Sequence, residues 1–215
     1  ITPAARRRWL AFWKAQLAKL DATFAEAPLT ADGRLDRDIL RDDLVRSIWL
    51  AEHERPFEQD ARVYGGYSTD SVFSLLTQST LPRETNVANC IARMKLIPAT
   101  LEEARTSLTD PVPTMLETAI QQNRGSIAFY DRQIFDLVGD SPQVPALREA
   151  AAAVVVALRR HQEFLEKDVL PRARGQWRLG RETFSRKLEL VLDMGWDADR
   201  VVAEARREFD RVRHD

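Results

Sequence analysis

The sequence has a single cysteine, no long apolar run and almost no net charge. Cys90 is the only cysteine among 215 residues, which excludes an internal disulfide and a metal site built from several cysteines. The longest apolar run, 150–158, is about half of a membrane span. A formal net charge of −1 gives no general attraction to nucleic acid or to an anionic membrane. No segment typical of a secretory signal is present, so we expect a cytoplasmic protein that binds neither nucleic acid nor membrane.

Catalytic and metal-binding motifs are also missing. The sequence contains no HExxH, no Glu-x-x-His, no Gly-x-Ser-x-Gly and no phosphate-binding loop. His53 lies between two glutamates that point in other directions on a helix, and His161 lies on an apolar helical stripe that is typical of a core residue. The basic triplet 6–8 is short and favours a solvated surface over nucleic-acid contact. We therefore predict no catalytic residue, metal ligand or cofactor in this chain.

The sequence is rich in apolar residues spaced by threes and fours. Such spacing is typical of amphipathic helices, and no alternation typical of strands competes with it. Thr2 is the predicted N-cap of the first helix, whose stripe from Trp9 to Phe24 forms one buried face; Asp32 and Gly33 make the turn after it. The sequence predicts an all-α bundle of about eight helices with short loops, folded as one domain over 1–215. The predicted helices are 3–27, one ending before 56, 72–78, 82–97, 98–108, 113–138, 141–169, 181–193 and one from 197 onward.

Two passages lack clear helical periodicity. In 57–71, the glycine pair 65–66 is flanked by Tyr64 and Tyr67, which predicts either a mobile loop or a loop that contacts substrate. In 170–188, Trp177 and Arg178 lie between Gly175 and a second glycine at 180. Glycine lets the backbone turn or approach another surface closely. Arg178 then pairs either with a structural carboxylate of a neighbouring helix or with the terminal group of a substrate.

Three segments carry a resemblance to a known family. The first is PRETNVANCIARMKLIP at 82–98, the second is the helix that follows it, and the third is LPRARGQWRLGRETF at 170–184. The chain resembles the N-terminal half of a large bacterial family of unknown function, which is itself similar to helical zinc metallopeptidases of the carboxypeptidase type. The residues that match are Arg83, Asn86, Val87, Arg93, Ile97, Pro98, Leu101, Ala104, Leu108, Leu170, Pro171, Gly175, Trp177, Arg178, Leu179, Gly180 and Phe184.

The resemblance implies that this chain is one part of a longer protein. The partner of this chain would be a missing C-terminal half, which carries HExxH, a further glutamate and the zinc ion. This chain would form one wall of a groove for a peptide substrate. Tyr64, Tyr67, Trp177 and Arg178 are the predicted groove residues. An apolar surface left for the missing half also favours homodimers of the isolated chain. The alternative is a free-standing helical interaction module without catalysis.

Overall fold

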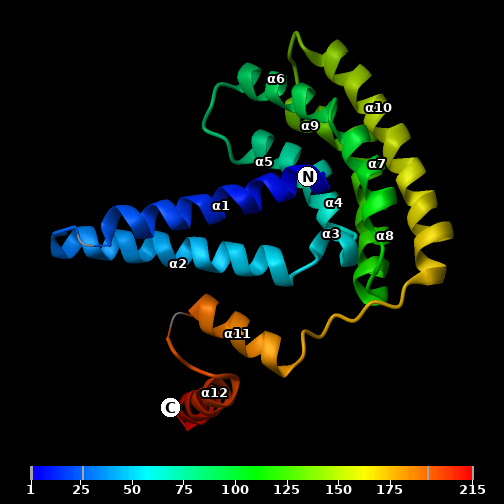
Figure 1. Ribbon diagram of the computed structural model, residues 1–215. Helices are drawn as coiled ribbons and strands as arrows, with labels where there is room; N and C mark the ends of the chain where they lie inside the picture. Colours follow the sequence, from blue (N-terminus) through cyan, green and yellow to red (C-terminus); the bar gives the residue numbers. More distant parts are fainter. Residues whose placement is uncertain (1, 26, 193, 215) are drawn as a thin grey trace. The chain divides into compact units, whose positions relative to one another are not determined.

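The computed structural model describes residues 2–25, 27–192 and 194–214, and these form helices and no strand (Figure 1). This confirms the predicted all-α fold. The longer helices of the described residues are α1 (Pro3–Phe24), α2 (Ala31–His53), α6 (Arg83–Met94), α7 (Ile97–Ser107), α8 (Pro113–Ala128), α10 (Val144–Glu163), α11 (Arg181–Leu192) and α12 (Ala198–His214). The shorter ones are α3 (Pro56–Gln59), α4 (Arg62–Gly65), α5 (Ser71–Thr77), α9 (Ile134–Val138), the π-helical turns η1 (Gly66–Asp70), η2 (Phe129–Gln133) and η3 (Phe164–Val169), and the 3-10 turn η4 (Leu170–Arg172).

The chain divides into two compact units. One comprises Arg55–Gln176 and is called the central unit from its place in the sequence. The other comprises Thr2–Glu54 and Trp177–Asp215 and is called the flanking unit. Each unit is described by itself. That the whole of 1–215 folds as one domain stays a prediction.

The core of the central unit is organised on α10. This helix buries Leu147, Ala151, Val154, Leu158 and His161, which are spaced by four and three residues and therefore share one face. α6, α7 and α8 pack on α10, as do η2 and η3. The helix begins at Val144 rather than at the predicted Ser141–Pro142. The Ser141 hydroxyl accepts from the Gln143 amide at 3.1 Å and donates to Glu84 at 2.8 Å.

Helical structure extends through 57–71, where the sequence predicted a loop. α3, α4 and η1 occupy this region, and η1 is joined to the end of α8 and to η2 by buried hydroxyl groups. The Tyr130 hydroxyl donates to the Ser68 carbonyl at 2.5 Å, and the Thr69 hydroxyl donates to the Ser126 hydroxyl at 2.8 Å. A π turn adds a residue to the helical repeat and so shifts the apolar stripe. A 3.6-residue template therefore misses this segment.

The passage after η4 is not helical, as predicted: residues 173–180 form extended chain. Its glycine at 175 lies directly against the segment that precedes α8. The Gly175 amide donates to the Pro111 carbonyl at 3.0 Å, and a Cβ on Gly175 would lie 2.4 Å from the Asp110 carbonyl oxygen. Only glycine allows this approach, so the predicted close contact of the backbone is confirmed.

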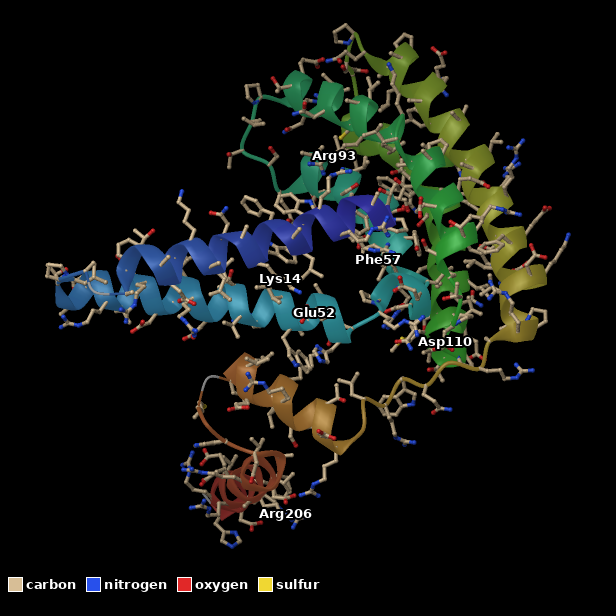
Figure 2. The ribbon with its side chains drawn as sticks, in the orientation of Figure 1. Lys14, Glu52, Phe57, Arg93, Asp110 and Arg206 are labelled. Carbon is tan, nitrogen blue, oxygen red and sulfur yellow. The ribbon has the colours of Figure 1, made fainter. Side chains whose placement is uncertain are left out.

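In the flanking unit, α1 lies beside α2, and α11 contacts both α2 and α12 (Figure 1). Lys14 and Glu52 point toward one another across α1 and α2 and form an ion pair at 2.5 Å (Figure 2). Arg41 and Asp21 form a second pair between the same helices at 2.9 Å. Both pairs are solvent-exposed, so they orient the helices more than they stabilise them.

A threonine caps the N-terminus of both α1 and α2. The Thr2 hydroxyl accepts from the Ala5 amide at 3.2 Å, which confirms the predicted N-cap. The Thr30 hydroxyl accepts from the Gly33 amide at 3.1 Å in the same way. The predicted turn at Asp32 and Gly33 is therefore wrong, because both residues lie in the first turn of α2.

The flanking unit has almost no core. Among its described residues only Leu44 is buried, and no residue of α1, α11 or α12 is. The predicted buried stripe of α1 is only partly covered, because Trp13, Leu17, Leu20 and Phe24 are half-buried whereas Trp9 is 58% exposed. The predicted end of the helix before α12, Asp193, lies outside the described residues. Apolar side chains that stay exposed in this unit include Trp9, Phe12, Leu35, Ile39, Phe184, Phe209 and Val212.

His161 is the polar member of the α10 face. It is only 5% exposed and lies between the rings of Tyr64 and Phe164, whose centroids are 6.4 Å and 6.0 Å from its own. Burial and, to a smaller extent, the nearby positive charge of Arg105 together lower the pKa of His161 to about 4. The predicted core position of His161 is confirmed.

We expect Gly175→Ala to lower the free energy of unfolding by about 1–3 kcal/mol, because the added methyl overlaps the Asp110 carbonyl. Gly65→Ala is the matched control. Its Cβ would meet no atom within 4 Å, and alanine raises stability in a helix by up to about 1 kcal/mol. Urea unfolding of both variants measures the difference. Equal stability of the two variants would contradict the close contact at Gly175.

The buried state of His161 predicts a pH dependence of stability. The unfolded histidine, with a pKa near 6.5, takes up a proton at a higher pH than the folded one, with a pKa of about 4. Stability is therefore lost as the pH falls, by about 2 kcal/mol between pH 7 and pH 5. His161→Gln should remove this part of the dependence, whereas His53→Gln, at an exposed position, should retain it. Urea unfolding of both variants at pH 7 and pH 5 measures this change in the free energy of unfolding. If His161→Gln loses as much stability as the unchanged protein between these pH values, His161 is not the group responsible.

Candidate functional site

Tyr64 and Tyr67, two of the predicted groove residues, both contact the ring of Phe57 in the central unit. Tyr64 is 0% exposed, and its hydroxyl donates to the Phe57 carbonyl at 3.0 Å. Tyr67 is 49% exposed, and its ring stacks on that of Phe57 with centroids 6.1 Å apart. The structure thus brings both tyrosines to Phe57, but presents only Tyr67 on the surface.

Trp177 and Arg178, the other two predicted groove residues, belong to the flanking unit. Trp177 is 56% exposed, and the Arg178 guanidinium lies 4.7 Å from the centre of its ring. No ion pair of Arg178 with a carboxylate occurs within the described ranges. The two residues form an exposed aromatic and cationic pair. Contact of these four residues with a substrate stays a prediction.

A cleft that the sequence did not predict lies between α7 and α10 of the central unit. Its inner part has a volume of about 70 Å³ and is lined by Pro98, Leu101, Glu102, Arg105, Ala157, Arg160 and His161. A wider hollow of about 410 Å³ adjoins it and shares Glu102, Arg105 and Arg160, with Glu163, Phe164, Lys167 and Asp168 completing its wall. Residues spaced by three or four on each helix face the cleft. That spacing is visible in the sequence, whereas the pairing of α7 with α10 is not.

The charged side chains of this cleft differ in their contacts. The Arg105 guanidinium lies 4.7 Å from the centre of the Phe164 ring, and its Nε is 3.5 Å from Glu102 Oε1. Arg160 has no ion pair with any carboxylate in the part of the chain that the structure describes. Nδ1 of His161 is fully buried and accepts or donates no hydrogen bond within the same residues. The cleft therefore holds Arg105, which has two partners; Arg160 and Lys167, which have no ion pair among the described residues; and an imidazole whose Nδ1 has no hydrogen bond there.

Cys90 does not offer a nucleophile. It is buried on α6, and its Sγ donates to the Val72 carbonyl at 3.7 Å. Burial raises the pKa of the thiol to about 11, so the reactive thiolate is scarce at neutral pH. Burial likewise raises the pKa of Tyr130, whose hydroxyl is held by Ser68. Both groups are structural.

Within residues 2–25, 27–192 and 194–214, no group of three or more His, Cys, Asp or Glu side chains is arranged to hold a metal ion. None of the described helices is long and apolar enough to span a membrane.

A solved structure described as "a putative lipoprotein of unknown function" from Shewanella oneidensis is similar to this chain. The TM-score is 0.80 at 24% sequence identity, and the similarity covers 98% of this chain. At that identity the likeness shows the fold alone. This chain spans 39% of the length of that protein. No curated protein matches the chain.

The family comparison covers the chain more completely. The family described as "bacterial protein of unknown function (DUF885)" matches residues 1–215. The match agrees with the resemblance to a bacterial family of unknown function that the segments around Pro82 and Leu170 indicated. It says nothing of peptidase activity. The chain belongs to the DUF885 family of bacterial proteins of unknown function.

Proposed function

We propose that this chain is the helical, non-catalytic part of a longer zinc-dependent hydrolase that resembles a peptidase, in which it forms one wall of the substrate groove. One observation carries the proposal most directly. The same fold occurs in the Shewanella oneidensis protein, where it accounts for 39% of the chain. Such a fraction leaves ample length for a second, catalytic part.

The flanking unit supports the proposal. Its described helices bury a single residue, Leu44, and leave large apolar side chains such as Trp9, Ile39 and Phe209 exposed. Exposed apolar side chains in this number are typical of a surface that another part covers. In the proposal, that part is the remainder of the longer protein.

The zinc ion of the proposal does not belong to this chain. The described residues offer no cluster of ligands that fits the metal, so no chemical step is assigned to them. Their part is to bind and orient the substrate. Tyr67 and the pair of Trp177 with Arg178 offer exposed aromatic and cationic surface for a peptide, while Tyr64 supports Phe57 from inside the core, with ring centroids 6.2 Å apart.

We expect the full-length protein to contain about one zinc ion per chain and to hydrolyse peptides, and both properties should be lost on chelation and restored by added zinc. The segment 1–215 alone should bind no zinc and cleave nothing. Metal analysis and a mixture of short peptides, followed by mass spectrometry, test both statements. A full-length protein that lacks zinc and activity would favour the interaction module instead.

Trp177 gives a sharper test of the groove. In the full-length protein, Trp177→Ala should raise KM for a peptide substrate several-fold while kcat changes little, because the lost contact binds ground state and transition state alike. Leu96→Ala is the control, since Leu96 is a large apolar residue of the central unit that is 67% exposed and belongs neither to the predicted groove nor to the apolar surface of the flanking unit. Steady-state kinetics of the two variants decide. An equal KM in both variants would remove Trp177 from the groove.

A further inference from the structure

We propose that the cleft between α7 and α10 binds a small carboxylate, whose charge is held by Arg160 and whose oxygen is met by His161. The site lies wholly within the central unit and does not depend on the zinc chemistry proposed above. It is assigned from three independent features: the shape of the cleft, the state of His161 and the contacts of its cations.

The inner cleft has room for a ligand of a few heavy atoms. A buried water needs about 10–15 Å³ of such space, and the inner cleft offers about 70 Å³. Pro98, Leu101 and Ala157 line it with apolar surface. A short aliphatic group therefore fits here better than a fully hydrated ion.

His161 is the buried polar group in the wall of the cleft. It lines the inner cleft at more than nine-tenths burial, and its Nδ1 is fully enclosed without a hydrogen bond from the described residues. A ligand in the cleft therefore meets the other ring nitrogen, Nε2, which also has no hydrogen-bond partner among the described residues. Because its pKa is lowered to about 4, the ring is neutral near pH 7 and donates through one nitrogen only.

The cations of the cleft favour an anion over a metal ion. Arg105 is already engaged by the Phe164 ring and by Glu102. Arg160 lines both the inner cleft and the wider hollow without a carboxylate partner in the described part of the chain. A guanidinium binds a carboxylate through two parallel hydrogen bonds. Arg160 is therefore the primary anchor for the charge of the ligand.

The acidic side chains of the wider hollow set an upper limit on that charge. Glu163 and Asp168 line the hollow together with Lys167, so its charges are mixed rather than basic. Repulsion from these two carboxylates is about twice as strong for a doubly charged phosphate as for a singly charged carboxylate. A free short-chain acid and the C-terminal residue of a peptide both present this chemistry.

Titration of the protein with three probes tests the site. Isobutyrate represents the free acid, N-acetylalanine represents a peptide C-terminus, and isobutyramide has the shape of the acid without its charge. We expect saturable binding of isobutyrate or N-acetylalanine at millimolar concentration, read from the ring signals of His161 in NMR spectra. The probe that binds with the lower Kd shows whether the ligand is a free short-chain acid or the C-terminal residue of a peptide. Binding of isobutyramide should not reach saturation in the same concentration range.

Arg160→Gln should weaken binding of the carboxylate about tenfold or more, because a charge-assisted hydrogen bond is lost. Arg159→Gln, the adjacent exposed position that does not line the cleft, should leave the affinity unchanged. His161→Gln should weaken binding as well, and Arg160→Gln alone decides if that core variant does not fold. Absence of saturation, equal binding of the amide, or equal effects of the two arginine variants would overturn the proposal and leave ordered water as the partner of His161.

Discussion

The buried face of α10 is the constraint on which the central unit depends. α6, α7 and α8 all pack on this helix, and Leu147, Val154 and Leu158 are fully buried there. Each such side chain contributes about 1.5–3 kcal/mol by leaving water. The same face includes His161, which also lines the cleft beside α7. Stability and the candidate site are thus properties of one helix face.

How far the sequence predicts this structure differs from element to element. The stripe of α10, the Thr2 cap and the non-helical chain after Pro171 follow from local patterns, and the structure confirms them. The helical turns within 57–71 were missed because the π turn η1 breaks the 3.6-residue repeat. Periodicity shows which face of α1 is apolar but not whether anything covers it, so the exposure of Trp9 was not predictable. Arg160 was missed because α7 and α10 are distant in sequence.

The two units differ in the interactions that stabilise their helices. The central unit has a continuous core that includes Tyr64, Met94, Leu116 and Leu158. The described helices of the flanking unit instead present amphipathic faces, joined by exposed ion pairs such as Lys14 with Glu52. Exposed pairs contribute little to stability, so these helices depend on apolar cover that their own unit does not provide. This difference is the physical support for the proposal that another part of a longer protein covers these helices.

Native-state hydrogen exchange of the 215-residue chain tests this account most directly, because it reports the stability of each helix separately. The account predicts that the slowest amides lie in α8 and α10 and exchange only through global unfolding. Amides of α1, α11 and α12 should exchange faster, through local opening of helices that bury no residue. Protection in α1 and α12 equal to that in α10 would contradict the account, because it would show that the flanking helices are stable without further cover.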